Sequence, residues 1–164
     1  MGKVKDYYME EIEADDASPD PYGPQLTLIR GLPGAGKSTY AQTHFSKSLH
    51  FEADQFFELN NGEYKFDPAL ISCAHDWCYS NTVKALRWGY DVVVTNTFTQ
   101  IWELDRYLAI PTLVYIDIKV IELRTQFQNI HGVPEAKLKQ MAARWQSIPQ
   151  DWIDNGLRVN IVEK

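Results

Sequence analysis

The sequence predicts an α/β fold in which a parallel sheet is covered by helices on both faces. From about Gln25 onward, short apolar runs rich in β-branched residues alternate with segments of helical periodicity. Strands that alternate with helices pair in parallel, because each crossover helix returns the chain to the same edge of the sheet. With 164 residues, 45% hydrophobic and 23% charged, the chain has the size and composition of one globular domain.

The expected elements follow one another in a regular order. The expected strands are residues 25–30, 49–53, 91–96, 112–118 and 157–162. The expected helices are residues 38–45, 66–89, 101–109, 120–128 and 134–146, the last two separated by a break at "NIHGV". The signals are clearest in the longest helix, where Asp67 is an N-cap, Pro68 takes the first position and Gly89 ends the helix.

Helical spacing also predicts which side of this long helix is buried. The buried residues expected from the spacing are Leu70, Ala74, Trp77, Cys78, Ala85 and Trp88. The chain has two cysteines, Cys73 and Cys78, five residues apart in the same helix. This geometry is poor for a disulfide, and two cysteines are too few for a zinc cage. We therefore expect two reduced thiols in the core.

The acidic charge is concentrated at the start of the chain. Residues 1–20 hold seven acidic and two basic residues, whereas the rest holds 15 acidic and 14 basic. Residues 1–24 are therefore expected to be an acidic, mobile tail, with 25–164 as the folded domain. A tail that competes with an anionic substrate for a basic groove is the alternative. The start lacks the apolar core of a signal peptide, and no apolar run is long enough to span a membrane, so we expect a cytoplasmic protein.

A phosphate-binding motif lies between the first strand and the first helix. In "LTLIRGLPGAGKSTYA", Gly31, Gly36, Lys37 and Ser38 satisfy the Walker A pattern G-x-x-x-x-G-K-[ST]. The loop glycines let backbone N–H groups turn toward phosphate oxygens, and the helix adds its positive N-terminus. Lys37 would contact the β- and γ-phosphates, and the Ser38 hydroxyl would bind Mg²⁺. The expected nucleotide-binding residues are Gly31, Gly34, Ala35, Gly36, Lys37, Ser38 and Thr39.

These features predict a nucleoside triphosphate site at one rim of the sheet. Ligands bind beyond the carboxyl ends of parallel strands, and the glycine loop, Asp54 and "TNT" at 95–97 all follow strands. The small size excludes a motor or a switch GTPase, and the guanine-selecting "NKxD" does not occur. A minimal domain of this kind is typical of a phosphotransferase.

Several segments together resemble a known family. "RGLPGAGKST", "FEADQFF", "GEYKFDPALISCAHDWC", "VVVTNTFTQIWELDRY" and "NIHGVPEAKLKQMAARW" occur in the order found in small P-loop kinases related to phage 5′-polynucleotide kinase. The chain is most similar to an AAA-type branch with the pattern "ADDFF…AH…DNTNT…HGVP", over roughly residues 25 to 147. The resemblance implies a three-layer P-loop kinase fold with a five-stranded parallel sheet in the order 2-3-1-4-5.

The resemblance also implies roles for individual residues. Asp54 would be the general base for the acceptor hydroxyl, although it could also cap the following helix. Asn96 and Thr97 match part of "DNTNT" and could position the acceptor, or serve only as turn caps. Charge over the transferred phosphoryl group would come from the lid bases Arg124, His131 and Arg144.

The chain departs from the family at positions that concern metal and substrate. Thr95 and Phe98 replace the family's aspartate and second asparagine, which leaves Mg²⁺ to Ser38 and the phosphates, with Asp54 as a further candidate. Gln128 stands where family members often have an arginine. An arginine that follows the base in polynucleotide kinases is also missing from "DQFF", where Phe56 or Phe57 could stack a base or belong to the core.

We therefore expect an ATP- and Mg²⁺-dependent kinase whose acceptor is the 5′-hydroxyl of a polynucleotide or nucleotide. The nearest alternative changes only the acceptor, to a hydroxymethylated base in phage DNA or a small metabolite. A phage origin would place the protein in the infected bacterial cytoplasm. A second alternative is a nucleotide-binding regulatory module that transfers no phosphoryl group, which the missing arginine and aspartate favour.

Overall fold

The computed structural model describes residues 23–59, 61–125 and 132–163. The predicted acidic tail up to residue 22, His131 and the end of the predicted helix at 126–128 lie outside these residues. Among the described residues, no helix is long and apolar enough to cross a membrane.

Five parallel strands form one sheet in the order β2-β3-β1-β4-β5, which confirms the predicted order. The strands are β1 (Gln25–Arg30), β2 (Leu49–Phe51), β3 (Val92–Asn96), β4 (Asp117–Leu123) and β5 (Arg158–Val162). Central β1 pairs with β3 from Leu26↔Val92 and with β4 from Gln25↔Asp117. The topology places the carboxyl ends of β1, β2 and β3 side by side.

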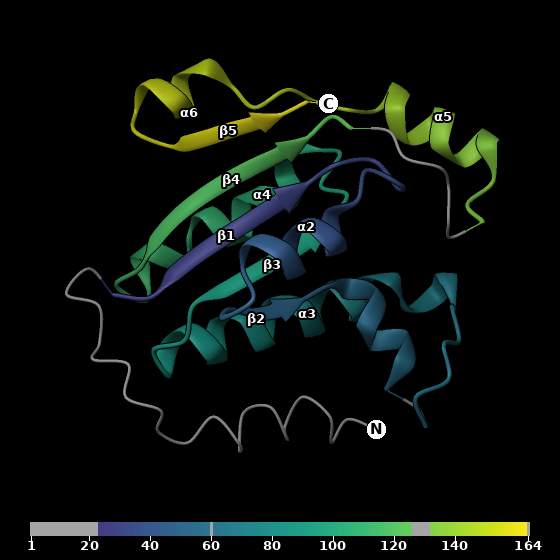
Figure 1. Ribbon diagram of the computed structural model, residues 1–164, viewed down its shortest axis with the longest axis horizontal. Coiled ribbons are helices and arrows are strands. Elements are labelled where there is room, and N and C mark those ends of the chain that lie inside the picture. Colours follow the sequence, from purple (N-terminus) through teal and green to yellow (C-terminus); the bar gives the residue numbers. More distant parts are fainter. Residues whose placement is uncertain (1–22, 60, 126–131, 164) are drawn as a thin grey trace.

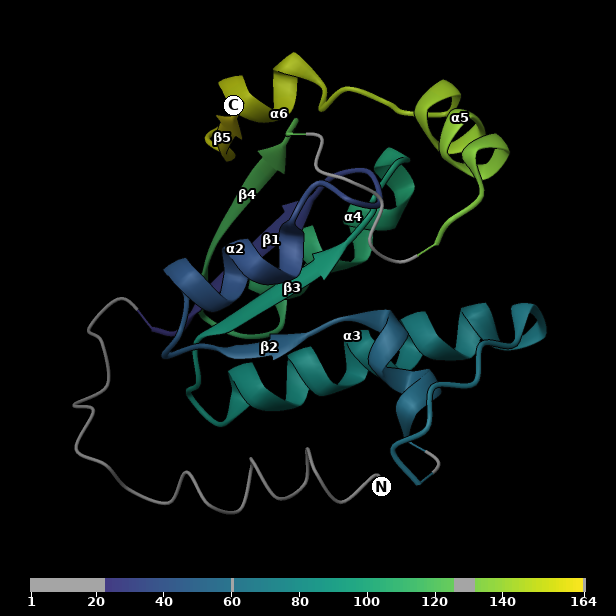
Figure 2. The same ribbon diagram turned by 45° about the vertical axis from the view of Figure 1, so that its right-hand side comes forward.

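Helices cover both faces of the sheet, so the fold has three layers (Figures 1 and 2). Helix α2 (Lys37–His44) lies on one face, and α3 (Ile71–Arg87) and α4 (Ile101–Leu108) lie on the other. Helix α5 (Glu135–Ala143) lies beyond the carboxyl ends of the strands, and α6 (Gln150–Asp154) precedes β5. Short 3₁₀ helices are η1 (Ala53–Glu58), η2 (Pro68–Leu70) and η3 (Ile110–Thr112).

Alternation along the strands produces two hydrophobic cores. Leu26 and Leu28 of β1 belong to the core beneath α3 and α4, whereas Ile29 belongs to the smaller core beneath α2. Because β1, β3 and β4 are covered on both sides, their sequences are nearly continuous apolar runs. This double burial fixes the position from which the phosphate-binding loop begins.

The predicted position of the fourth strand in the sequence was wrong. The strand spans Asp117–Leu123, and the expected helix over 120–128 does not form in its described part. In the sequence, Glu122 fits the polar side of a helix. In the structure it is a buried strand residue whose carboxylate pairs with Arg30. The apolar residues at the start of the predicted strand lie before β4 and outside the sheet, and Leu113 and Tyr115 are largely exposed.

The long helix begins later than predicted, and its buried side is narrower. Asp67 does act as an N-cap, with its carboxylate accepting from the Ala69 N–H at 2.9 Å, but it caps η2, and α3 follows. Leu70 and Trp88 are exposed, which corrects the expected buried set. Cys78 is buried and Cys73 is exposed, and neither forms a disulfide, so only one is in the core. Periodicity alone could not place the helix ends, where the sheet no longer covers the side chains.

Candidate functional site

Three loops meet at the carboxyl ends of β1, β2 and β3, as the sequence predicts. The Gly31 N–H donates to the Thr97 carbonyl at 3.3 Å, which joins the loops after β1 and β3. The Ala53 N–H donates to Asn96 Oδ1 at 3.0 Å, which joins the loops after β2 and β3. The glycine loop, the segment around Asp54 and "TNT" therefore form a single site.

The glycine loop has the conformation that a phosphate-binding loop needs. Gly34 and Gly36 have φ of 83° and 81°, values that side-chain-bearing residues rarely adopt. A Cβ at Gly31 would lie 2.9 Å from the Leu123 carbonyl oxygen and 3.1 Å from the Ala35 Cβ. The loop is also tied from outside, because the Thr125 hydroxyl donates to the Ala35 carbonyl at 2.6 Å.

The first turn of α2 suits an anion. Its N-cap is Gly36, which has no capping side chain, and the turn has no acidic residue. The N–H groups of this turn are therefore not covered by a side-chain cap, and the helix dipole favours negative charge there. Of the predicted binding residues, Ala35 is buried and Thr39 is exposed.

Lys37 lies inside the glycine loop. Its Nζ donates to the Gly31 and Leu32 carbonyls at 3.0 and 3.1 Å. Burial lowers the pKa of the Lys37 amine to about 8, and the carboxylates of Glu52 and Asp54 oppose this change. The pKa of Lys37 is low because the two carboxylates offset only part of the effect of burial. A polyanion that enters the loop would raise this pKa again.

Ser38 contacts a carboxylate that the sequence did not single out. The Ser38 hydroxyl donates to Glu52 Oε1 at 2.9 Å, and the same oxygen lies 3.3 Å from His50 Nε2. His50 Nε2 is also hydrogen-bonded to Thr95 Oγ1 at 2.7 Å. The hydroxyl at position 95, where the family has an aspartate, therefore supports His50, and the carboxylate that contacts Ser38 comes from Glu52, the residue directly after β2.

A hydroxyl and a carboxylate that touch are a donor set suited to Mg²⁺, which binds through few protein oxygens together with substrate phosphates. Among the described residues, no three His, Cys, Asp or Glu side chains form a metal cluster. The residues present thus fit an ion shared between protein and nucleotide. The advance signal for Glu52 was its position near the end of the predicted strand 49–53, in "FEADQ".

Asp54 lies on η1 at the same rim and is exposed. The alternative that it caps this helix is wrong, because the N-cap is Glu52, whose backbone N–H donates to Gln55 Oε1 at 3.0 Å. Asp54 also lies near enough to the glycine loop for its charge to act on Lys37. The position is suitable for a base that faces a substrate.

Asn96 and Thr97 are parts of the framework of this rim. Asn96 is buried, and its amide contacts the Cys78 thiol at 3.8 Å while its oxygen accepts from the Ala53 N–H. Phe98 follows with φ of 45° and a buried side chain, a strained conformation for an aromatic residue. The chain turns sharply at this residue after β3, next to the Thr97 carbonyl that accepts from the Gly31 N–H.

Phe57 is not an exposed ring. It is 5% exposed and packs in the core beneath η1, so its predicted use as a stacking surface for a substrate is not compatible with its burial. Its neighbours Tyr64 and Phe66 are exposed instead. The "DQFF" pattern could not distinguish these cases, because a helix of six residues has no clear apolar side.

The lid bases are held by different partners. Arg124 Nε donates to Glu122 Oε1 at 2.7 Å, and its NH1 donates to Glu163 Oε1 at 2.9 Å. These bonds raise the pKa of the Arg124 guanidinium. Arg144 Nε donates to Thr99 Oγ1 at 3.1 Å, at the end of α5. The two arginines therefore lie on opposite sides of Arg30, and His131 lies outside the described residues.

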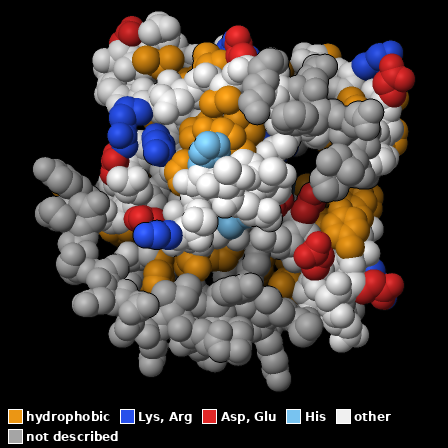
Figure 3. All heavy atoms as spheres, in the orientation of Figure 1, with side chains coloured by type: hydrophobic (Ala, Val, Ile, Leu, Met, Phe, Trp, Pro, Cys, Tyr) orange, Lys and Arg blue, Asp and Glu red, His pale blue; other side chains and the backbone are white. Residues whose placement is uncertain are grey.

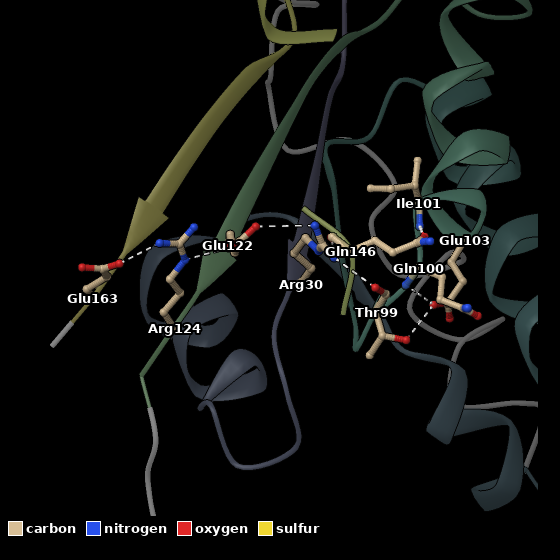
Figure 4. A network of polar contacts seen from close by, with 9 residues as sticks. All are labelled: Arg30, Thr99, Gln100, Ile101, Glu103, Glu122, Arg124, Gln146 and Glu163. Carbon is tan, nitrogen blue, oxygen red and sulfur yellow. Dashed lines mark hydrogen bonds and ion pairs between the residues drawn. The ribbon is translucent and has the colours of Figure 1, made fainter. Parts of the chain in front are cut away.

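A buried arginine network underlies the site (Figure 4). Arg30, the last residue of β1, is fully buried, and it donates to the Gln146 carbonyl at 2.8 Å and to Glu122 at 3.5 Å. Its guanidinium stacks on Trp145, 3.9 Å from the ring centre. Burial lowers the pKa of Arg30, and Glu122 opposes this. Arg30 thus anchors the segment after α5 to the strand that carries the glycine loop.

Comparison with known proteins agrees with this geometry. The family described as "AAA domain" (AAA_33) matches residues 26–147. Human NEDD4-binding protein 2 is 30% identical over 134 residues, which cover 74% of this chain and 8% of that protein. The chain thus spans less than a tenth of the length of this curated relative.

Solved structures share the fold. A chain of the Pnkp1/Rnl/Hen1 complex has a TM-score of 0.54 and 19% identity, with 73% of this chain and 46% of that one covered. A gluconokinase from Sinorhizobium meliloti has a TM-score of 0.55 and 13% identity, with 87% and 83% covered. The chain therefore has a kinase-like P-loop phosphotransferase fold, in agreement with the predicted fold class.

Proposed function

We propose, from the premise that this chain belongs to the AAA_33 family of AAA domains, that it transfers the γ-phosphoryl group of ATP to a hydroxyl. The observation that carries this proposal is the contact between the first turn of α2 and the residue after β2, where Ser38 meets Glu52 two residues before Asp54. The phosphate-binding loop, the Glu52 carboxylate and the candidate base Asp54 thus lie at the same rim of the sheet.

The proposed step uses residues already in place. The N–H groups of the loop and Lys37 hold the β- and γ-phosphates, and Asp54 accepts the proton of the acceptor hydroxyl. The hydroxyl oxygen bonds to the γ-phosphorus as the bond from that phosphorus to the β,γ-bridging oxygen breaks, and ADP leaves. Ser38 and Glu52 would hold Mg²⁺, which supplies positive charge to the phosphates when bound.

The proposed acceptor is the 5′-hydroxyl of a polynucleotide or nucleotide. Support comes from the order of the family-like motifs and from the Pnkp1 structure, whose name places that protein in a complex with Rnl and Hen1. A small-metabolite acceptor is the second candidate, because a gluconokinase superposes equally well. Hydroxymethylated bases in phage DNA, and a regulatory role without transfer, are the remaining alternatives from the sequence.

The test is transfer of label from γ-labelled ATP with Mg²⁺ to 5′-hydroxyl DNA, 5′-hydroxyl RNA or hydroxymethyluracil DNA. Label on a 5′ end supports the proposal, and label on internal bases supports the modified-base alternative. Label in gluconate or another small hydroxyl compound would move the acceptor to metabolites. Label only in free phosphate, or none, would favour the regulatory module.

Asp54→Asn tests the base. Loss of a general base lowers turnover by about 10²–10⁴-fold, whereas ATP binding should be retained because the glycine loop is intact. Asp105→Asn, an exposed aspartate on α4, is the matched control with unchanged turnover. Normal turnover of Asp54→Asn would disprove the assignment.

A further inference from the structure

Two exposed aromatic rings lie in the segment that connects η1 to η2. Tyr64 is 51% exposed and Phe66 is 44% exposed, and we call this pair the aromatic platform. On this side of the molecule, hydrophobic side chains gather at the surface with acidic side chains beside them (Figure 3). Exposed large rings in pairs need an explanation, because single ones are ordinary but contiguous ones commonly mark binding sites.

The platform is rigidly supported from below. Phe57 packs edge-on against both rings, with centroid distances of 6.2 Å to Tyr64 and 5.1 Å to Phe66. The Lys65 N–H also donates to the Phe57 carbonyl at 2.9 Å, which fixes the backbone between the rings. The buried Phe57 therefore supports two rings that are each about half exposed, and Lys137 Nζ lies 5.5 Å from the centre of the Phe66 ring.

The platform lies beside the proposed base. In a 3₁₀ helix, residues three apart are eclipsed and about 6 Å apart along the axis, so Asp54 lies one turn before Phe57 in η1. The electrostatics agree with this placement: partial burial raises the pKa of the Tyr64 phenol, and the charges of Asp54 and Glu58 raise it further. An acceptor whose hydroxyl reaches Asp54 would thus extend over the rings.

The surrounding charge limits what can lie there. Asp54, Glu58, Glu63 and Asp67 are acidic, and the basic side chains are Lys65, paired with Glu63 at 3.4 Å, and Lys137 of α5, 5.5 Å from the Phe66 centroid. This excess of negative charge repels a phosphate but does not repel an uncharged planar group. It also favours a hydroxyl end over the phosphorylated end that the reaction would produce.

We propose that Tyr64 and Phe66 stack the nucleobase of the nucleotide that carries the acceptor hydroxyl. The inference rests on the proposed function and names the part of the substrate that its acceptor site recognises. Stacking suits any base, because every base has a π-face, so the platform would recognise a terminal nucleotide without selecting its sequence.

The experiment compares 5′-hydroxyl oligonucleotides whose first residue carries a base or is abasic. In the wild type, loss of the base should raise KM by about 5- to 140-fold, the range for stacking of one base. Tyr64→Ala and Phe66→Ala should each raise KM for the base-bearing oligonucleotide and reduce the ratio between the two acceptors toward one. Tyr64→Phe, which keeps the ring, should restore the ratio.

Tyr115→Ala is the matched control, because this tyrosine is 75% exposed and lies before β4, at the opposite end of the sheet. Its ratio should equal that of the wild type. Thermal melting checks that each variant folds, and Tyr64→Ala keeps the test valid if Phe66→Ala weakens the packing on Phe57. An unchanged ratio in both alanine variants would overturn the platform.

Failure of the proposed function gives a different pattern. If the wild type labels neither oligonucleotide, transfer to polynucleotide ends is excluded, and the platform is tested by anisotropy of a labelled 5′-hydroxyl oligonucleotide with a non-hydrolysable ATP analogue. Binding that Tyr64→Ala weakens and Tyr115→Ala does not would support the platform alone. Absence of wild-type binding, or equal binding by all variants, would overturn it.

Discussion

The Ser38 hydroxyl donates a hydrogen bond of 2.9 Å to Glu52 Oε1, which connects the residue after the loop lysine to the end of β2. The two residues are 14 positions apart in the sequence, and only the parallel pairing of the sheet brings them together. This contact supplies a carboxylate near the phosphates in a chain that has Thr95 in place of the family's aspartate. It leads to the first of five predictions.

Glu52→Gln should weaken Mg²⁺ binding while the fold is retained. The amide keeps the size of the side chain but removes the negative charge, and the loss of a supporting group costs about 10–100-fold in metal affinity. Titration of activity against Mg²⁺ at saturating ATP measures the change. Glu58→Gln, an exposed glutamate of the same η1 helix, should leave the Mg²⁺ dependence unchanged, and equal curves for both variants would contradict the prediction.

Lys37→Met should stabilise the nucleotide-free protein and abolish ATP binding. The folded pKa of about 8 lies below the unfolded value of 10.5, so protonating this amine opposes folding at neutral pH. The corresponding gain in the free energy of unfolding is about 1–3 kcal/mol at pH 7. Urea denaturation measures it, with Lys47→Met, an exposed lysine, as the neutral control. A variant less stable than the wild type would disprove the prediction.

The same pKa predicts a pH dependence with a definite sign. Between pH 8 and 10.5 the unfolded chain binds more protons at Lys37 than the folded one, so wild-type stability rises with pH. The advantage of Lys37→Met should therefore shrink over this range and be constant below it. The ATP affinity of the wild type should fall above about pH 8, as the amine loses its charge. Denaturation and ATP titration across pH 7–10.5 measure both trends, and an advantage independent of pH would exclude this cause.

Gly31→Ala should impair the phosphate-binding loop by steric conflict. The added Cβ would lie 2.9 Å from the Leu123 carbonyl oxygen, a backbone atom that cannot move freely. Overpacking of this kind costs about 1–3 kcal/mol of stability, and ATP affinity should fall with it. Gly89→Ala separates the two effects: its φ is 89° but nothing lies within 4 Å, so stability should fall while ATP binding is retained. Calorimetric titration with ATP and thermal melting distinguish the variants.

Arg30→Met should destabilise the protein strongly, because it leaves the buried Glu122 carboxylate with one arginine partner fewer. Removal of one member of a buried ion pair costs about 3–5 kcal/mol. Lys139→Met breaks an exposed pair with Glu135 and should cost at most about 0.5 kcal/mol. Urea denaturation of Arg30→Met, Glu122→Gln and the double variant should show strong coupling. Additive losses would mean that the two residues act independently.

The motif and the parallel pairing could be predicted from local patterns in the sequence, whereas the strand order came from the resemblance to a known family. The glycine loop lies between an apolar run and a helix, and repeated strand–helix alternation leads to parallel pairing. The position of β4 could not be predicted, since Glu122 looks polar until Arg30 is seen to neutralise it in the interior. The roles assigned to Asp54, Arg124 and Arg144 stay predictions.

The sequence by itself therefore determined the fold class and the position of the phosphate-binding motif after the first strand, through spacing within single segments. Only the tertiary structure decided that Glu52 meets Ser38, that Phe57 is buried, and that Tyr64 and Phe66 are exposed beside Asp54. These relationships connect residues from separate strands and loops. They depend on which side chains the sheet and its helices enclose, and on partners that no local pattern contains.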